Sequence, residues 1–367
     1  MSNQKLFIVC TGLGLVNRGF ETYITDLSEM LSQSKNFNYT FAVFSAGRFS
    51  LEGVKTVQVP AINRNSKFLH FFTKNIHSLF SIEQISFFFP FLFYVFIKKP
   101  KLIYLGEYNL YCYLFKIRKL FKLKYSLALY TGGQATPGLY DPKLDYVHHI
   151  TDIYISELLK SGIPSNKQFL IPHFIRTNVG ICEKLYSDII LKAGAKKIVL
   201  SVGSLDNSVK RLKDLALLLT KVANCFPVFL GDYTPETKEI EQVLLDFFGK
   251  GNFILKKVPR KDLPTYYSAA LVLVSCSLHE SFGLVNLEAF LMGTEVIYHE
   301  YQESKFVLKG LSLKMNLKDD FINIKDSIES NSLNQKRIDL RKFVFDNYDS
   351  SVLLKSYENM FSQMINN

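Results

Sequence analysis

The chain has 367 residues, 48% of them hydrophobic, which is enough to bury the cores of two domains of ordinary size. Residues 1–180 carry 20 Lys and Arg against 10 Asp and Glu, and the remainder 24 against 23, so we expect the first half to meet something anionic. The five scattered cysteines exclude a disulfide scaffold, and the absence of a signal-peptide pattern leads us to expect a reducing cytoplasm.

The first 60 residues alternate between short apolar runs and an amphipathic segment, as in an α/β domain. Leu6–Val9 is predicted to be a buried strand, followed by a glycine loop that includes Gly14. The next segment, up to Leu31, has the helical period, and Phe41–Phe44 and Thr56–Val59 are predicted strands. A loop between strand and helix can face a phosphate or a sugar, but this one lacks the Gly-x-Gly-x-x-Gly dinucleotide fingerprint.

An aromatic and basic region comes next. Phe87–Ile97 is an uncharged run of 11 residues, too short for a spanning helix, which needs about 20 apolar residues. Lysines between Lys98 and Lys124 follow it, mixed with Tyr, Leu and Phe. We interpret the region either as core helices with a solvated basic face, or as a surface whose apolar side chains enter an anionic membrane. No nucleic-acid motif accompanies it, so nucleic acid is not an expected partner.

Apolar strand patterns continue through the rest of the chain, at Leu102–Leu105, Ser126–Leu129, Lys197–Val202, Val228–Leu230 and Ala270–Val274. Segments with helical patterns separate several of these runs. The alternation predicts two doubly wound α/β domains.

The stretch Ser275–Phe290 carries the clearest chemical signal. It follows a buried strand and continues into a helical pattern, so it is predicted to be a strand, turn and helix. The free N–H groups and dipole at the helix start make a seat for a diphosphate, and Gly283 lets a ligand lie against the backbone. Glu280 in the turn and Glu288 in the helix can face that ligand. Such a unit is nevertheless common, and Glu288 can equally be a solvated helix residue.

This stretch resembles the Glu-x7-Glu signature of the retaining glycosyltransferases of family 4. The residues that correspond to the signature are Glu280, Phe282, Gly283, Leu284 and Glu288. The resemblance implies that Glu280 lies beside the donor sugar. It implies that the amides around Phe282, Gly283 and Leu284, with the neighbouring Ser281, hold the diphosphate. Glu288 would bind the ribose hydroxyls.

Weaker resemblances place further residues at the donor. The loop with Gly14 resembles one that lines the interdomain cleft in the family. Lys210 falls at the position of a phosphate-binding lysine, while Ser204 stands where an arginine usually lies, so Arg211 is the candidate substitute. The segment around Val258 resembles the one whose backbone meets the nucleotide base.

The resemblance implies a GT-B architecture. Residues 1–172 would form an acceptor-binding domain, with Asp152–Glu157 as its last strand and the helix 347–367 packing back on it. Residues 173–346 would bind the donor. The implied reaction is retaining transfer of a hexosyl or N-acetylhexosaminyl group from a UDP- or GDP-linked sugar to a hydroxyl. The acceptor would be a saccharide or lipid-linked, in surface polysaccharide or glycolipid assembly.

No cofactor is expected, and without an Asp-x-Asp pair the enzyme is predicted to be metal-independent. We expect a cytoplasmic location, with peripheral attachment to the inner face of the membrane as one alternative. A second hypothesis is a non-catalytic protein that binds sugar nucleotides or membranes on the same scaffold. It rests on Ser204 and on a donor-contacting histidine of the family, for which Thr131 or Gln134 stands here.

Overall fold

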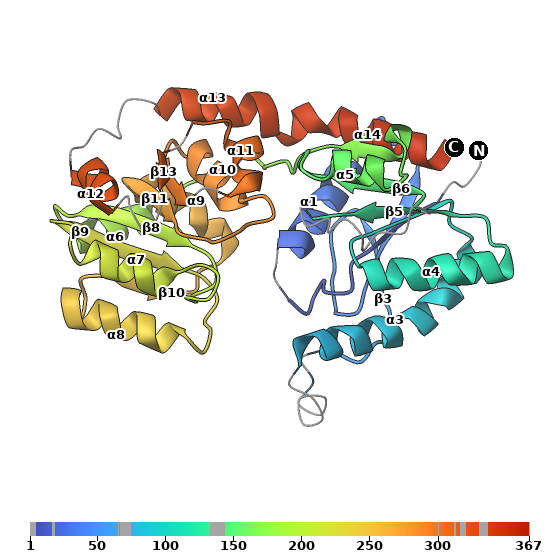
Figure 1. The fold of residues 1–367 in the computed structure, drawn as a ribbon, viewed down its shortest axis with the longest axis horizontal. Coiled ribbons are helices and arrows are strands. Elements are labelled where there is room, and N and C mark those ends of the chain that lie inside the picture. The colour runs from blue at the N-terminus through green and yellow to red at the C-terminus, as the bar shows by residue number, and fades with distance from the viewer. Residues whose placement is uncertain are drawn as a thin grey trace. The chain divides into compact units, whose positions relative to one another are not determined.

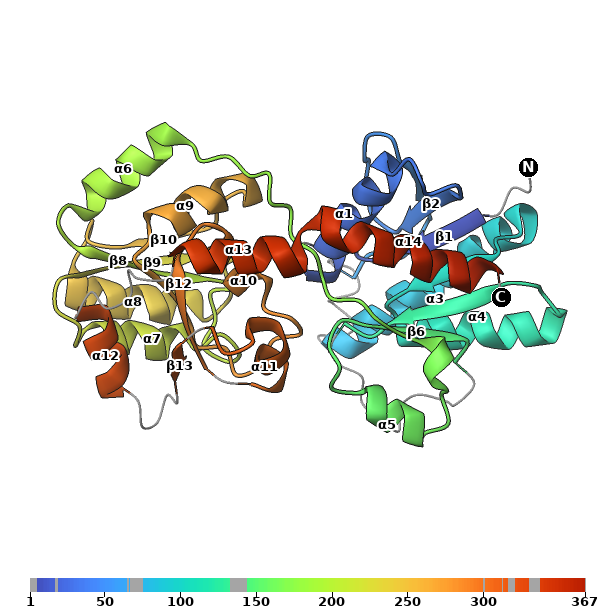
Figure 2. The same cartoon turned by 90° about the horizontal axis from the view of Figure 1, so that it is seen from above.

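A computed structural model describes residues 5–16, 19–64, 66, 75–132, 144–299, 301–311, 313–315, 321–329 and 337–366. Gln134 therefore lies outside the described residues. The chain forms two compact units, Met1–His173 together with Leu353–Asn367, and Phe174–Val352. Each unit contains one parallel sheet with helices on both faces (Figure 1, Figure 2), which confirms the prediction of two doubly wound α/β domains.

The sheet of the first unit has seven strands in the order β3-β2-β1-β4-β5-β6-β7. Their bounds are Lys5–Val9 (β1), Thr40–Ser45 (β2), Lys55–Gln58 (β3), Leu102–Leu105 (β4), Ser126–Tyr130 (β5), Tyr146–His149 (β6) and Gln168–Leu170 (β7). The chain proceeds from β1 to β3 on one side and from β4 to β7 on the other. The strand order therefore reverses between β1 and β4.

Helices cover both faces of this sheet. Ile76–Lys98 (α3) and Tyr108–Phe121 (α4) lie on one face, where Phe91 packs against the rings of Phe7 and Phe44. Gly19–Gln33 (α1) and Ser350–Asn366 (α14) lie on the other face, where Phe361 of α14 packs against Tyr104 of β4. The prediction that Asp152–Glu157 forms the last strand of this unit was wrong. Ile155–Lys160 is a short helix (α5), and the strands around it are β6 and β7.

The aromatic run belongs to a helix twice its length. By length and composition alone, Ser78–Lys98 is long and apolar enough to cross a membrane. The run itself contains no charge, but α3 extends upstream through Glu83, a buried residue that forms an ion pair with the buried Arg64. One side of α3 packs against the sheet, and its opposite side leaves five apolar side chains exposed: Ile85, Phe89, Phe93, Phe96 and Ile97.

The sheet of the second unit has six parallel strands in the order β10-β9-β8-β11-β12-β13. Their bounds are Lys197–Val202 (β8), Cys225–Leu230 (β9), Ile254–Lys256 (β10), Val272–Ser275 (β11), Glu295–His299 (β12) and Leu313–Met315 (β13). The helices are Glu183–Ala193 (α6), Leu212–Leu219 (α7), Thr237–Phe248 (α8), Leu263–Ala269 (α9), Leu284–Leu291 (α10), Gln302–Leu308 (α11), Phe321–Glu329 (α12) and Arg337–Tyr348 (α13). Here the order reverses between β8 and β11, so this is where a doubly wound sheet leaves space for a ligand.

Candidate functional site

The turn after β11 leads into α10 through Gly283, the N-cap of the helix. Gly283 has φ +75°, a conformation that side chains disfavour, and an added Cβ would lie 2.6 Å from the hydroxyl oxygen of Tyr301. Leu284 begins the helix, so the first amides of α10 follow directly and have no partners within the helix. The buried ring of Phe282 packs against Tyr348 at 5.9 Å between centroids. Phe282 therefore anchors the turn, while Ser281 stays exposed.

Lys210 and Glu280 meet at the point where the strand order reverses. The Lys210 ammonium forms an ion pair with Glu280 Oε1, and the Ser277 hydroxyl donates to the same oxygen at 2.8 Å. The two residues are 70 positions apart, in the loops that follow the neighbouring strands β8 and β11. Both side chains are partly exposed. A cation and a carboxylate thus stand together beside the start of α10, a combination suited to a phosphorylated sugar.

Asp206 holds the backbone of the loop that carries Lys210, a role that the sequence did not reveal. Its Oδ1 accepts hydrogen bonds from the N–H groups of Val209 (2.9 Å) and Lys210 (2.8 Å), and its Oδ2 accepts one from the Ser204 hydroxyl. Burial alone would raise the pKa of Asp206, but these hydrogen bonds outweigh burial and lower it. The Ser204 hydroxyl therefore supports the loop, and its contact with a donor stays a prediction.

Arg211 follows Lys210 but takes a different direction. Its Nε donates to Asp214 at 2.7 Å, one turn into α7, and its φ of +55° places it in the left-handed region as the N-cap of that helix. The guanidinium is therefore engaged on α7. Only the Nε is bonded to Asp214, so the Nη groups can still donate to a phosphate, and a phosphate contact by Arg211 stays a prediction.

Glu288 lies on α10 between two partners. The Tyr267 hydroxyl donates to its Oε2 at 2.9 Å, and Arg260 Nη2 lies 3.8 Å from its Oε1. Arg260 follows β10 by a few residues, with the half-buried Val258 just before it. Arg260 thus brings the end of the Val258 segment close to Glu288, while the binding of a nucleoside by these residues stays a prediction. Glu288 is a partly buried, hydrogen-bonded carboxylate and not a solvated helix residue.

In the first unit, Gly14 lies where two loops cross. An added Cβ would lie 2.4 Å from the carbonyl oxygen of Arg48, and Gly47 donates its N–H to Leu13 O at 3.1 Å. The glycine is therefore required by the close approach of the two backbones. Whether a ligand also contacts it stays a prediction.

A buried carboxyl, Glu107, connects the loops at the reversal point of the first sheet. Its Oε1 accepts hydrogen bonds from the N–H (2.8 Å) and hydroxyl (3.1 Å) of Thr11, while its Oε2 has no partner among the described residues. Burial, together with the nearby charge of Glu21, raises the pKa of Glu107 to about 7. The Arg64 Nη2 donates to the Thr11 hydroxyl at 3.3 Å. No sequence motif marked this group, because its members come from distant loops.

Two histidines of this unit, His148 and His173, lie in its core. His148 and His173 are buried, and burial lowers the pKa of each to about 3, so both are neutral. His148 Nδ1 lies 2.6 Å from the Tyr104 hydroxyl, and its Nε2 lies 2.9 Å from Ile171 O. Thr131, the described candidate for the histidine position of the family, is buried and donates its N–H to His148 O at 3.1 Å.

Comparisons with known proteins concern the sequence pattern of the second unit and the fold of the chain. Residues 184–312 match the family model of the glycosyl transferases group 1, so the second unit carries the sequence pattern of that family. Comparison with curated protein sequences gives no significant match.

Three solved structures are similar over nearly the whole chain. A sucrose-phosphate synthase from Thermosynechococcus elongatus has TM-score 0.81 and 16% identity, with 99% of each chain covered. The lipopolysaccharide outer core galactosyltransferase WaaB has TM-score 0.69 and 15% identity, with 98% of this chain and 99% of that one covered. The Anabaena protein HepE, in complex with UDP and glucose, has TM-score 0.71 and 12% identity, with coverage of 98% and 99%. The likeness confirms the GT-B fold.

Proposed function

We propose that this protein is a retaining glycosyltransferase that moves a hexosyl or N-acetylhexosaminyl group from a UDP- or GDP-linked sugar to a hydroxyl acceptor. The observation that carries the proposal is the pairing of Lys210 with Glu280 at the strand-order reversal, beside the start of α10. The family match of residues 184–312 supports it, because it covers this same site. The similarity to a protein crystallised with UDP and glucose is consistent with a nucleotide-sugar donor.

In the proposed mechanism, the second unit stabilises the leaving diphosphate. Negative charge on the diphosphate grows as its bond to the sugar breaks, and the Lys210 ammonium and the first amides of α10 would face that charge. Preorganised donors of this kind typically contribute a few kcal/mol each to lowering a barrier. Asp206 holds the Lys210 backbone before the donor arrives, so little reorganisation is needed.

The remaining residues would bind the rest of the donor. Glu280 would accept hydrogen bonds from the sugar hydroxyls, and Glu288 from the ribose hydroxyls, with the Val258 backbone at the base. The acceptor oxygen would enter on the face that the diphosphate leaves, and its proton would pass to a phosphate oxygen. Because Lys210 and the amides supply positive charge, we propose that no metal is required.

We further propose that the first unit receives the acceptor at a membrane surface in the cytoplasm, in polysaccharide or glycolipid assembly. The exposed apolar side of α3 supports this, since the contact between Phe96 and Phe121 joins it to the end of α4, where Lys116, Lys119 and Lys122 lie. Apolar side chains at a membrane interface and lysines beside anionic lipids both favour reversible binding. Vesicle sedimentation tests the surface. We expect binding to anionic but not neutral vesicles, weakened by high salt and by Lys116/Lys119/Lys122→Glu.

The central test uses the donor alone. A thermal-shift screen of UDP, GDP and their sugars should identify one nucleotide that raises the melting temperature, because a ligand at a hundred times its Kd stabilises by about 2.7 kcal/mol. The same sugar nucleotide should be slowly hydrolysed or transferred, with the anomeric configuration of the product retained. Binding without turnover would favour the alternative, a non-catalytic protein that binds sugar nucleotides. The observation that favours this alternative is Ser204, which stands where the family has an arginine and donates its hydroxyl to Asp206.

A further inference from the structure

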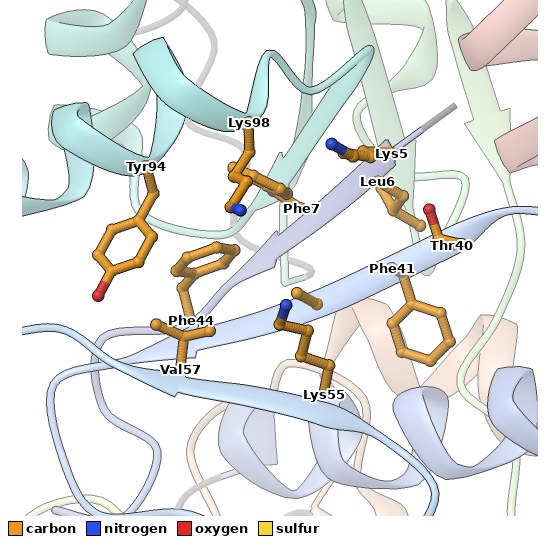
Figure 3. A pocket seen from close by; sticks show the side chains of 11 residues that line it. Lys5, Leu6, Phe7, Thr40, Phe41, Phe44, Lys55, Val57, Tyr94 and Lys98 are labelled. Carbon is orange, nitrogen blue, oxygen red and sulfur yellow. The ribbon is translucent and has the colours of Figure 1, made fainter. Parts of the chain in front are cut away.

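A cavity of about 330 Å³ opens at the amino ends of β1, β2 and β3, at the edge of the first sheet opposite the Thr11 and Glu107 loops (Figure 3). It lies between the face of these strands and the last turns of α3, which contributes Tyr94 and Lys98. Its volume falls at the lower end of the range of about 300–1,000 Å³ for ligand pockets. None of the residues proposed above to bind the donor, and none of the α4 lysines proposed to meet the membrane, lines this cavity.

The alternation of side chains along the strands explains the cavity. Phe7, Ala42 and Lys55 are cross-strand partners on one face of the sheet, and Phe44 is paired with Val57 two positions further along. Phe91 of α3 covers Phe7 and Phe44, but the small side chain of Ala42 leaves the space beside them unfilled. The result is an apolar floor beneath a partly open mouth.

The mouth is basic. Lys5, Lys55 and Lys98 come from three different elements and lie on different sides of the hollow in Figure 3. No acidic residue lines the cavity, and within the described part of the chain none of the three lysines forms an ion pair. Three uncompensated positive charges around an apolar hollow fit a ligand with an anionic head and an apolar tail.

The cavity continues the exposed apolar side of α3. Phe93 and Ile97, both exposed, directly precede Tyr94 and Lys98 in the helix, so the cavity opens on the flank of the surface proposed above to meet the membrane. A soluble anion would pair with the lysines but would leave the apolar floor without a contact. An apolar ligand would cover the floor but would leave the lysines without a partner. A phospholipid drawn from the adjoining bilayer uses both.

We propose that this cavity binds one acyl chain of an anionic phospholipid, whose phosphate lies among Lys5, Lys55 and Lys98. The inference rests on the membrane contact proposed for the first unit, but not on glycosyl transfer. The lipid would act as a specific anchor and would fix how the first unit lies against the bilayer, in addition to the general attraction of the lysines on α4.

The test uses full-length protein and phosphatidylcholine vesicles containing phosphatidylglycerol with a photoreactive diazirine in its acyl chain. Cross-links mapped by mass spectrometry should fall on the cavity floor, at Phe7, Ala42, Phe44 and Val57. Ala42→Phe fills the cavity without changing charge and should reduce these cross-links at least about tenfold, because excluding even two methylene groups has an effect of that size. Val57→Trp fills the cavity from the edge strand β3 and should reduce the cross-links in the same way. It replaces Ala42→Phe in the test if that variant misfolds.

The lysines are tested separately. Lys5/Lys55/Lys98→Gln should abolish the preference for phosphatidylglycerol over a diazirine phosphatidylcholine. Lys184/Lys192/Lys238→Gln makes the same change of net charge at exposed lysines of the second unit and should leave the preference intact. Glycerol phosphate, a head group without a chain, should not compete.

Three results would overturn the inference. Cross-links confined to Phe89, Phe93 and Phe96 would mean that the bilayer only touches α3. Unchanged cross-linking in both cavity-filling variants would place the chain elsewhere, and effective competition by glycerol phosphate would show an anion site without a chain site. Donor hydrolysis by lipid-free protein is measured in parallel. It should be unchanged in the cavity variants, so a failure of the proposed activity is seen independently of the lipid result.

Discussion

Glu107→Gln is expected to change how the stability of the first unit depends on pH. Glu107 is buried, and its pKa of about 7 lies above the ordinary value of 4.5 that applies in the unfolded chain. A pKa raised by that amount corresponds to about 3 kcal/mol. The variant replaces the protonated carboxyl by a neutral amide whose oxygen can still accept the two hydrogen bonds from Thr11.

The sign follows from proton linkage. Between pH 4.5 and 7 the folded protein keeps a proton on Glu107 that the unfolded chain has lost, so the wild type loses stability as pH rises. Its stability relative to the variant is therefore highest below pH 4.5, falls by about 3 kcal/mol up to pH 7, and is constant above that. The buried His148 and His173, with lowered pKa values, oppose this trend equally in both proteins and cancel in the difference.

The assay is urea unfolding at closely spaced pH values, followed by far-UV circular dichroism. Glu157→Gln, at an exposed position on α5 in the same unit, is the matched control. Its free energy of unfolding should differ from that of the wild type by the same amount at every pH. If the difference in the free energy of unfolding between the wild type and Glu107→Gln is also constant from pH 4.5 to 7, Glu107 is ionised in the folded protein. The account of its burial is then wrong.

Three further predictions concern the second unit. Glu288→Ala should weaken nucleotide-sugar binding by about 1.5–3 kcal/mol in calorimetry, since hydrogen bonds to a charged group are lost; unchanged affinity would remove Glu288 from the donor site. Lys210→Gln should lower kcat by about 10²–10³ with a smaller effect on KM, because charge on the leaving group peaks in the transition state. Lys213→Gln, which removes an exposed lysine paired with Glu239, is its control, and equal kcat values in the two variants would argue against phosphate contact by Lys210. Gly283→Ala should destabilise the second unit in urea by about 1–2 kcal/mol because of its positive φ, and a stability equal to the wild type would mean that the turn relaxes.

The sequence predicted features whose signals are local. The strand, the turn and the helix around Gly283 follow one another directly, so a single stretch of chain specifies the N-cap and the amides of α10. The alternation of strands and helices likewise predicted both doubly wound sheets. Such features depend on neighbours in sequence, which patterns of apolarity and turn residues report.

Contacts between distant loops could not be predicted in this way. Lys210 meets Glu280 only because β8 lies next to β11, and Thr11 meets Glu107 only because β1 lies next to β4. Strand order is a property of the folded sheet and leaves no trace in periodicity. The local contact of Arg211 was likewise not predicted: the left-handed turn at this residue brings its Nε to Asp214, while its role at a phosphate stays a prediction.

The return of α14 to the first unit has a consequence for biosynthesis. Tyr357 is fully buried and donates its hydroxyl to Pro172 O, and Phe361 is equally buried against Tyr104, so the first unit completes its core with a helix that follows the second unit in sequence. The second unit, in contrast, is one continuous segment, Phe174–Val352. During translation this segment is complete before α14 has emerged from the ribosome. The unit that is made first is therefore expected to mature after the second, and its uncovered tyrosines would make the nascent chain depend on protection until α14 has emerged.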